Sequence, residues 1–297
     1  LAPDLDVLIQ SSTDPVLFLE YHRQFTHSLI FIPFGALIVS TLIFPLVRKS
    51  LSFQATYLAS FLGYATHGLL DACTSYGTLL FWPFSNERIT WNNISLADPL
   101  LTIPALIFLA AAIKTSRRRF SFLAVGWIVS YLALGLVQYE RALSSGIKLA
   151  QSRGHSAERM TLKPSFGNLI LWKSIYQHGD SFYVDAIRAG RTLTWCPGET
   201  IKIFDYQYHL PDLEKNSQQM KDIERFRWFS QDYLGFDGDK NLVTDVRYSM
   251  VPNQIAPMWG LVIKEQQGTN QHAVWWASRD LDDESLTLFK EMLLGDK

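Results

Sequence analysis

Residues 28–47 read SLIFIPFGALIVSTLIFPLV, and no charged side chain interrupts them. At a rise of about 1.5 Å per residue, a helix of this length crosses the ~30 Å hydrocarbon core of a bilayer. Three more apolar segments follow, at residues 51–70, 99–113 and 120–138. The segment at 51–70 carries Gln54 and His67, so we expect it to face protein rather than lipid. Together the four segments predict an α-helical transmembrane bundle.

The overall composition hides this pattern. Mean hydropathy is +0.04 and the net charge is −1, which are ordinary values for a soluble protein. Residues 1–150, however, hold ten Lys/Arg and eight Asp/Glu, whereas residues 151–297 hold seventeen and twenty. A soluble protein with buried core helices is the alternative, but four long uncharged runs near the transmembrane threshold favour a membrane protein. The balanced charge gives no reason to expect a nucleic-acid partner.

The connectors between the apolar segments predict the orientation. Residues 48–49 and 114–119 contain six basic side chains and no acidic one. Short basic loops stay in the cytoplasm, so residues 1–27, residues 71–98 and the chain after 138 should lie outside. The basic cluster Arg117–Arg119 has a second interpretation as a nucleic-acid contact, but the topology signal accounts for it fully.

After Gln138 the sequence changes to that of a soluble α+β domain. A helix should continue out of the membrane over residues 139–152. We expect strand-rich segments at residues 168–176, 181–189, 193–208, 242–250, 259–265 and 273–278, and helices at 218–233 and 282–294. The predicted organisation is therefore a membrane-embedded helical domain at residues 1–138 followed by an extracytoplasmic α+β domain at residues 139–297.

Two histidine motifs flank the first two apolar segments. His22 and His27 precede the first, and a loop that enters the helix near His27 would bring both imidazoles to one point. His67 and Asp71 close the second, where i,i+4 spacing puts imidazole and carboxylate on one helical face. Each motif also has a structural interpretation. Histidines are common at membrane borders, and an Asp can orient a structural His. Ionisable groups at the end of an apolar helix are nonetheless functional candidates.

A third motif, Asp4-Leu5-Asp6, suits either a metal or a turn. The orientation deduced from Lys and Arg alone puts all three motifs at the outer membrane–water boundary. We therefore expect a mixed N/O site for one or two divalent ions (Zn, Mn or Fe) with these ligands: Asp4, Asp6, His22, His27, His67 and Asp71. Such a site activates water and stabilises developing negative charge. Asp71 is then a candidate catalytic carboxylate, and Arg23 would hold an anionic substrate oxygen.

These motifs resemble the bacterial family of LexA-binding, inner-membrane-associated metal-dependent hydrolases. The blocks typical of that family are Pro-Asp-x-Asp, His-Arg-x-x-Thr-His-Ser, and His-x-x-x-Asp followed by Thr-x-x-Gly and Pro-Phe-Ser. They correspond here, in the family's order, to Pro3–Asp6, His22–Ser28, His67–Asp71, Thr74–Gly77 and Pro83–Ser85. The chain departs at Gln24, where the family usually has Gly, which changes local backbone freedom. Family members also begin with an apolar helix, so we expect an N-terminal segment before Leu1 that could supply a further ligand.

The resemblance implies a multi-pass protein of the bacterial inner membrane with its C-terminal domain outside the cytoplasm. We expect metal-dependent hydrolysis of a phosphoester or other ester in a lipid or amphiphilic substrate, with membrane lipids as partners. The alternative is a non-catalytic membrane protein in which the metal ties helix ends together and the outer domain binds a protein partner. A transporter would place polar groups near mid-membrane, where Gln54 and Thr56 are too few.

The remaining candidate ligands favour structural interpretations. Cys73 and Cys196 are the only cysteines, too few for a disulfide framework or a Cys-based zinc site. Cys73 lies near the expected metal site, but a small buried apolar role is favoured. No metal spacing connects the other histidines, which are His155, His178, His209 and His272.

Overall fold

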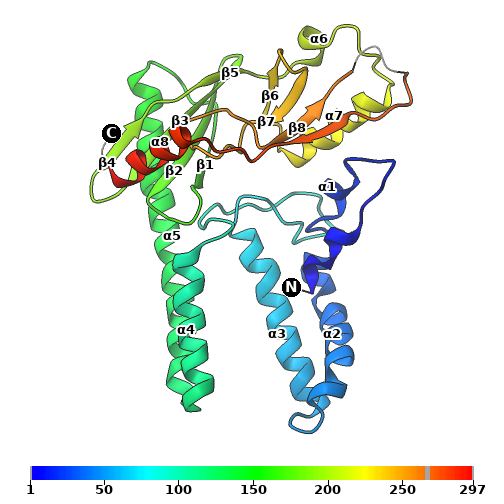
Figure 1. The fold of residues 1–297 in the computed structure, drawn as a ribbon, viewed down its shortest axis with the longest axis vertical. Helices are drawn as coiled ribbons and strands as arrows, with labels where there is room; N and C mark the ends of the chain where they lie inside the picture. The colour runs from blue at the N-terminus through cyan, green and yellow to red at the C-terminus, as the bar shows by residue number, and fades with distance from the viewer. Residues whose placement is uncertain (1, 265–267, 296–297) are drawn as a thin grey trace. The chain divides into compact units, whose positions relative to one another are not determined.

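The computed structural model describes residues 2–264 and 268–295 and contains two compact units (Figure 1). The first unit comprises Leu1–Trp91, Asp212–Asp232 and Val262–Trp275. The second comprises Asn92–Pro211, Tyr233–Leu261 and Trp276–Lys297. Neither unit is continuous in sequence. The boundary predicted at residue 138 lies inside a helix, and the division into domains at residues 1–138 and 139–297 stays a prediction.

The first unit is mainly helical. Its elements are the 3-10 helices η1 (Pro3–Leu8), η2 (Phe25–His27) and η3 (Leu29–Phe31), and the α-helices α1 (Leu17–Tyr21), α2 (Ile32–Val47), α3 (Phe53–Ala72) and α7 (Gln218–Phe229). Ser52 caps α3, because its hydroxyl accepts a hydrogen bond from the Ala55 amide. Helices α2 and α3 lie side by side, and they approach closely where Gly35 meets the buried ring of Tyr64.

The second unit pairs α4 (Pro99–Thr115) with the long helix α5 (Arg118–Ser152). The buried residues of α5 recur every three or four positions from Tyr131 to Ala150, so one face of its C-terminal half is covered. Part of this face packs on a sheet, because Gln138 donates hydrogen bonds to the carbonyls of Leu169 and Ala189. The helix therefore continues without a break through residues 139–152, as the sequence predicts.

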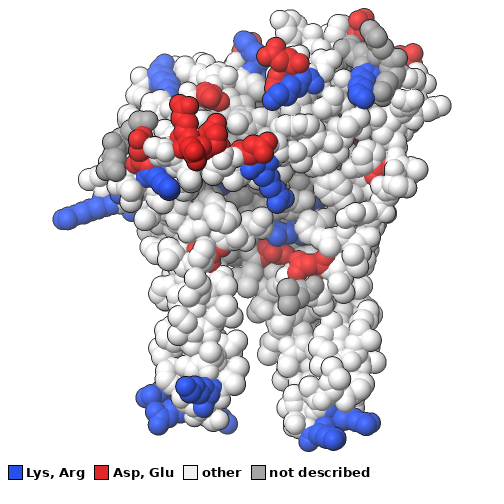
Figure 2. All heavy atoms as spheres, viewed as in Figure 1, with Lys and Arg blue, Asp and Glu red and all other residues white. Residues whose placement is uncertain are grey.

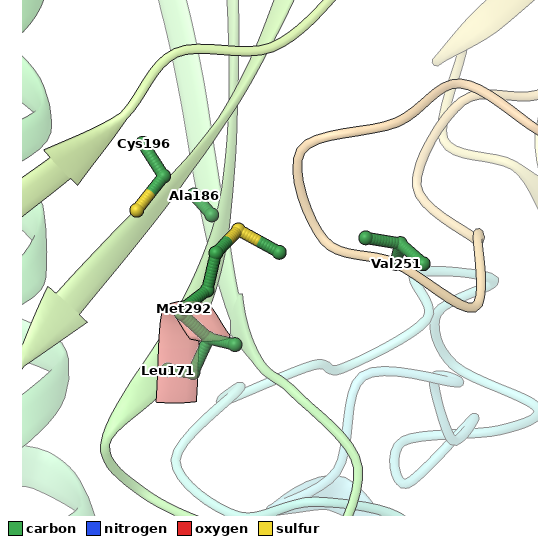
Figure 3. Packing of buried hydrophobic residues seen from close by; sticks show 5 residues of the cluster. All are labelled: Leu171, Ala186, Cys196, Val251 and Met292. Atoms are coloured by element: carbon green, nitrogen blue, oxygen red, sulfur yellow. The ribbon is translucent and has the colours of Figure 1, made fainter. Parts of the chain in front are cut away.

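The sheet beside α5 is antiparallel and has the strand order β1-β2-β3-β4, with β5 also paired to β3. Its strands are β1 (Arg159–Pro164), β2 (Leu171–His178), β3 (Ser181–Ala189), β4 (Leu193–Cys196) and β5 (Thr200–Lys202). The helix α8 (Asp283–Leu294) covers it, and Figure 3 shows Met292 among Leu171, Ala186, Cys196 and Val251. The short helix α6 (Tyr206–His209) follows β5.

A second sheet has the strand order β6-β7-β8-β9. Its strands are β6 (Leu234–Asp237), β7 (Leu242–Asp245), β8 (Trp259–Val262) and β9 (Val274–Ala277). The α+β character predicted after residue 138 is thus confirmed, although several strands are shorter than expected and the sequence analysis missed β1 and β6. Glu265, the end of one expected strand, lies outside the described residues.

Two helices in the described part of the chain are long and apolar enough to cross a membrane, Leu29–Val47 and Arg118–Ser152, and Pro99–Thr115 is a shorter apolar helix. All four predicted apolar segments are helical. Figure 2 shows Lys and Arg gathered at the tip of the α2–α3 pair and at the tip of the α4–α5 pair, where the sequence places the basic connectors. The four-span bundle itself stays a prediction.

The close contact between α2 and α3 predicts unequal effects at two glycines. A Cβ at Gly35 would lie 2.3 Å from the Tyr64 ring, whereas a Cβ at Gly63 meets nothing within 4 Å. Gly35→Ala should lower the free energy of unfolding by about 1–3 kcal/mol through overpacking. Gly63→Ala should leave it unchanged or raise it by about 0.5–1 kcal/mol through helix propensity. Thermal unfolding of both variants in detergent measures the difference; equal midpoints would contradict the packing.

Candidate metal centre

The buried carboxylate of Asp6 organises the end of the first unit where η1 meets the loop of residues 22–27. It receives three hydrogen bonds, from His22 Nδ1 (2.8 Å), the Arg23 amide (2.9 Å) and the Thr26 hydroxyl (2.7 Å). His27 Nδ1 lies 3.2 Å from it as an ion pair and shares a 2.9 Å hydrogen bond with the Thr26 hydroxyl. Burial works against ionisation of this carboxyl, but these hydrogen bonds outweigh it and hold the pKa of Asp6 well below its usual range. Asp6 therefore fixes the loop of residues 22–27 onto η1.

The contact between Asp6 and His27 Nδ1 also orients the His27 ring. With Nδ1 directed to Asp6, the Nε2 atom of His27 faces Asp71 Oδ2 at 3.0 Å. Burial disfavours the protonated imidazole, but the two neighbouring carboxylates, Asp6 and Asp71, outweigh burial and raise the pKa of His27. The two carboxylates thus stabilise positive charge at Nε2. A bound cation requires the same negative surroundings.

Four ligand atoms converge at this point, from Asp4, His27, His67 and Asp71. His67 Nε2 lies 3.1 Å from Asp4 Oδ1 and 3.4 Å from Asp71 Oδ2. His27 Nε2 lies 3.6 Å from Asp4 Oδ1. A tetrahedron with metal–ligand bonds of about 2.1 Å has edges of about 3.4 Å. The four separations, from 3.0 to 3.6 Å, bracket that value, so the four atoms are spaced as ligands of one divalent ion.

Two of these atoms face each other. His27 Nε2 and Asp71 Oδ2 are both buried and lie 3.0 Å apart as an ion pair, with no other hydrogen bond among the described residues. Burying two such groups is costly unless further partners satisfy them. A divalent metal would satisfy both atoms, since imidazole nitrogen and carboxylate oxygen are the donors such ions take, and the residues present therefore fit a metal.

Asp71 is held by Arg23. The guanidinium of Arg23 lies 3.2 Å from Asp71 Oδ1, leaving Oδ2 for the cluster, and also donates to the Thr74 hydroxyl at 3.0 Å. Arg23 itself is buried and sits at φ +60°, a left-handed conformation that turns the chain at this point. Gln24 follows at φ −95°, so the family's usual glycine is not needed there for a positive φ.

Gly68 lets α3 reach the loop that carries His27. A Cβ at residue 68 would lie 2.7 Å from the His27 carbonyl oxygen, so only glycine permits this approach without a shift. The neighbouring positions His67 and Asp71 are thereby brought to His27 across 40 residues of sequence. The predicted pairing of His67 with Asp71 on one helical face is confirmed by their 3.4 Å contact.

The six predicted ligands occupy two tiers. Asp4, His27, His67 and Asp71 offer atoms to one point, whereas Asp6 and His22 bind each other and lie outside that group. Asp6 instead orients His27, as carboxylates commonly do for metal-bound histidines. Arg23 contacts Asp71, and its role toward substrate stays a prediction. The group of potential ligands in the described residues does not include Cys73, which is buried.

Helix α7 supplies contacts to the same unit that the sequence analysis missed. Arg225 forms a bidentate pair with Asp14 (3.0 and 2.9 Å) and a 2.6 Å bond to Glu20 of α1. His272 joins Asp14 and Asp222 in a second cluster of potential ligands. Arg225 occupies both of those carboxylates, so this cluster is an ion-pair network that anchors α1. Nothing in the sequence around Arg225 indicates that it pairs with Asp14 and Glu20.

Asp6→Asn should weaken metal binding without unfolding the chain. Loss of the carboxylate removes the charge that orients and polarises His27, and comparable losses reduce metal affinity about 10–100-fold. Competition with a chelator of known affinity measures it. Asp14→Asn, the same change outside the cluster, is the matched control and should bind metal like the wild type. Equal affinities for the Asp6→Asn variant and the wild type would show that Asp6 does not act on the site.

The Arg225–Asp14 pair predicts a pH-dependent stability. Burial raises the pKa of Asp14, but hydrogen bonds and charge from Arg225 outweigh it and lower the pKa. The pair therefore stabilises the folded state above the unfolded pKa of about 3.9, and this contribution is lost as the pH falls toward the lower folded value. Asp14→Asn should cost about 1–3 kcal/mol at pH 7. The deficit should shrink below about pH 4 in unfolding measurements; a constant deficit would refute the ion pair.

Comparison with known proteins bears on this part of the chain. No curated protein and no solved structure matches it. Residues 1–142 match the model of a family described as YdjM inner membrane protein. The matched part contains all four residues of the metal cluster and both helices long enough to cross a membrane, the second of them in part. The match supports a relationship of residues 1–142 to an inner-membrane family.

Proposed function

We propose that this chain is an integral, multi-pass, metal-dependent hydrolase of the bacterial inner membrane. The observation that carries the proposal is the convergence of four ligand atoms, two of them buried, at the outer end of α2 and α3. The donors are two imidazole nitrogens and two carboxylate oxygens, which suit zinc, manganese or iron. A divalent metal held there would supply Lewis acidity and activated water for cleaving an ester or phosphoester.

The chain's own residues divide the remaining tasks. Asp6 and Arg23 are nearly inaccessible, and they hold His27 and Asp71 in fixed orientations. The side chains of Asp4 and His67 are 37% and 24% exposed, so one side of the cluster is open to an incoming substrate. A structural metal site is closed on all sides by protein, whereas a catalytic site keeps access. The open side therefore favours catalysis over the non-catalytic alternative.

The membrane topology belongs to the same proposal. The large apolar side chains of α2, α4 and α5 are exposed, among them Leu42 at 71% and Ile113 at 74%. A core helix of a soluble protein would bury such a face, so lipid is its natural environment. With the basic connectors in the cytoplasm, the metal cluster and the C-terminal α+β part lie outside. A substrate reached at that boundary is a lipid or another amphiphilic ester.

Purified full-length protein tests the activity. Hydrolysis of bis(p-nitrophenyl) phosphate and of phosphatidylglycerol vesicles is followed with added Mn²⁺ or Zn²⁺. Turnover should stop with EDTA and return with metal. Asp71→Asn removes a proposed metal ligand and should lower the rate at least as much as loss of a residue that orients a ligand does, roughly 10–100-fold, whereas Asp14→Asn should retain it.

The outcomes separate the two candidate functions. Bound metal without turnover on either substrate favours the non-catalytic protein and rejects the phosphoester proposal. Turnover that survives both EDTA and Asp71→Asn would place the activity elsewhere in the chain.

A further inference from the structure

A groove runs along the α2–α3 pair, entirely within the first unit. Its volume is about 370 Å³, within the roughly 300–1,000 Å³ of small-molecule sites. Val39, Ile43 and Val47 of α2 line one side at four-residue spacing, so they form one stripe of that helix. The lining is mostly apolar, and the hydroxyl of Thr56 is satisfied by the Ser52 carbonyl at 3.0 Å.

Small residues on α3 create the hollow. Ala59, Ser60 and Gly63 line the groove opposite the α2 stripe. A Cβ built on Gly63 meets nothing within 4 Å, so the space at this position is open. Gly35 on the neighbouring helix behaves in the opposite way, because Tyr64 fills the space beside it. The helices thus touch at Gly35, whereas the space beside Gly63 stays open.

One end of the groove is the metal cluster. His67 lines the groove and also contributes Nε2 to the cluster, 3.1 Å from Asp4. From His67 to Thr56 the groove follows eleven residues of α3, about 16 Å at ~1.5 Å per residue. One leaflet of a ~30 Å hydrocarbon core is about 15 Å deep. The groove therefore begins at the polar site and extends through about one leaflet.

We infer that this groove binds one hydrocarbon chain of a lipid substrate, whose polar head group lies at Asp4 and His67. The inference rests on the proposed function for the role of the head group and names the substrate class as an acylated membrane lipid. The apolar lining favours burial of methylenes over their exposure to water. In a membrane the gain over bulk lipid is smaller, so the polar cluster at the mouth provides the selectivity.

Filling the groove tests the inference. Gly63→Leu places a side chain in the open space without a backbone clash, and Gly126→Leu is the matched control. Gly126 is also an exposed helical glycine with nothing within 4 Å of a Cβ, but it does not line the groove. Delipidated full-length protein is titrated with dioleoyl phosphatidylglycerol and examined by native mass spectrometry, with EDTA present so that no turnover occurs.

The wild type should retain one lipid. Gly63→Leu should weaken retention at least tenfold, and Gly126→Leu should not change it. A lipid with a diazirine at the end of one acyl chain should label the Val47–Leu51 end of the groove in the wild type. Equal retention by Gly63→Leu and wild type, or labelling spread evenly over the exposed helices, would overturn the inference. Absence of any retained lipid would do the same and point to a protein segment as the occupant.

The readout separates this inference from the proposed function. If lipid is retained in the groove but no ester is cleaved with metal present, the hydrolase proposal is rejected and lipid binding in the groove is supported. If hydrolysis proceeds equally in the wild type and in Gly63→Leu while retention is also unaffected, the groove inference fails and the hydrolase stands.

Discussion

The buried carboxylate of Asp6 is the constraint on which the candidate centre depends. A charge so far from solvent is tolerable only when hydrogen bonds replace its hydration, and here the donors come from residues 22–27. The same bonds fold that loop back onto η1 and leave His27 Nε2 directed at Asp71. Without this carboxylate, the loop would lose its hydrogen-bond acceptor. The His27 ring would lose the contact that directs Nε2 to the cluster.

Much of this arrangement could be predicted from residue spacing. The i,i+4 relation of His67 and Asp71 requires only a regular helix, and α3 is regular over both residues. The apolar segments are helical for the same local reason. The α+β character of the C-terminal part also follows from β-rich runs joined by turn signals, as in the hairpin of β2 and β3, whose His178 and Ser181 pair across a tight turn at Gly179.

The division of labour among the ligands could not be predicted. Asp4 and Asp6 are two apart, and only the 3-10 turn of η1 sends one carboxylate to the cluster and buries the other. His22 was expected beside His27, but its ring lies 6.3 Å away and its Nδ1 is taken by Asp6. The backbone between Asp6 and His27 includes the positive φ of Arg23, and an arginine in the sequence does not indicate such a conformation.

Contacts between residues distant in sequence could not be predicted for a different reason. Arg225 lies more than 200 residues from its partners Asp14 and Glu20, and neither charge pattern identifies the other. Helix α7, predicted as part of a separate outer domain, packs with the unit that holds the metal cluster. Gly68 is similar: its need for close approach is visible only once the His27 carbonyl is placed beside it.

The proposed metal site, with its nitrogen and oxygen donors at the mouth of an apolar groove, connects the local chemistry with the membrane setting. X-ray absorption spectroscopy of the metal-loaded full-length protein tests this claim most directly. The account predicts an N/O first coordination shell at about 2.0–2.2 Å, with the outer-shell scattering of two imidazoles from His27 and His67. A sulfur scatterer at about 2.3 Å, which would implicate Cys73, or a spectrum without imidazole scattering would contradict it.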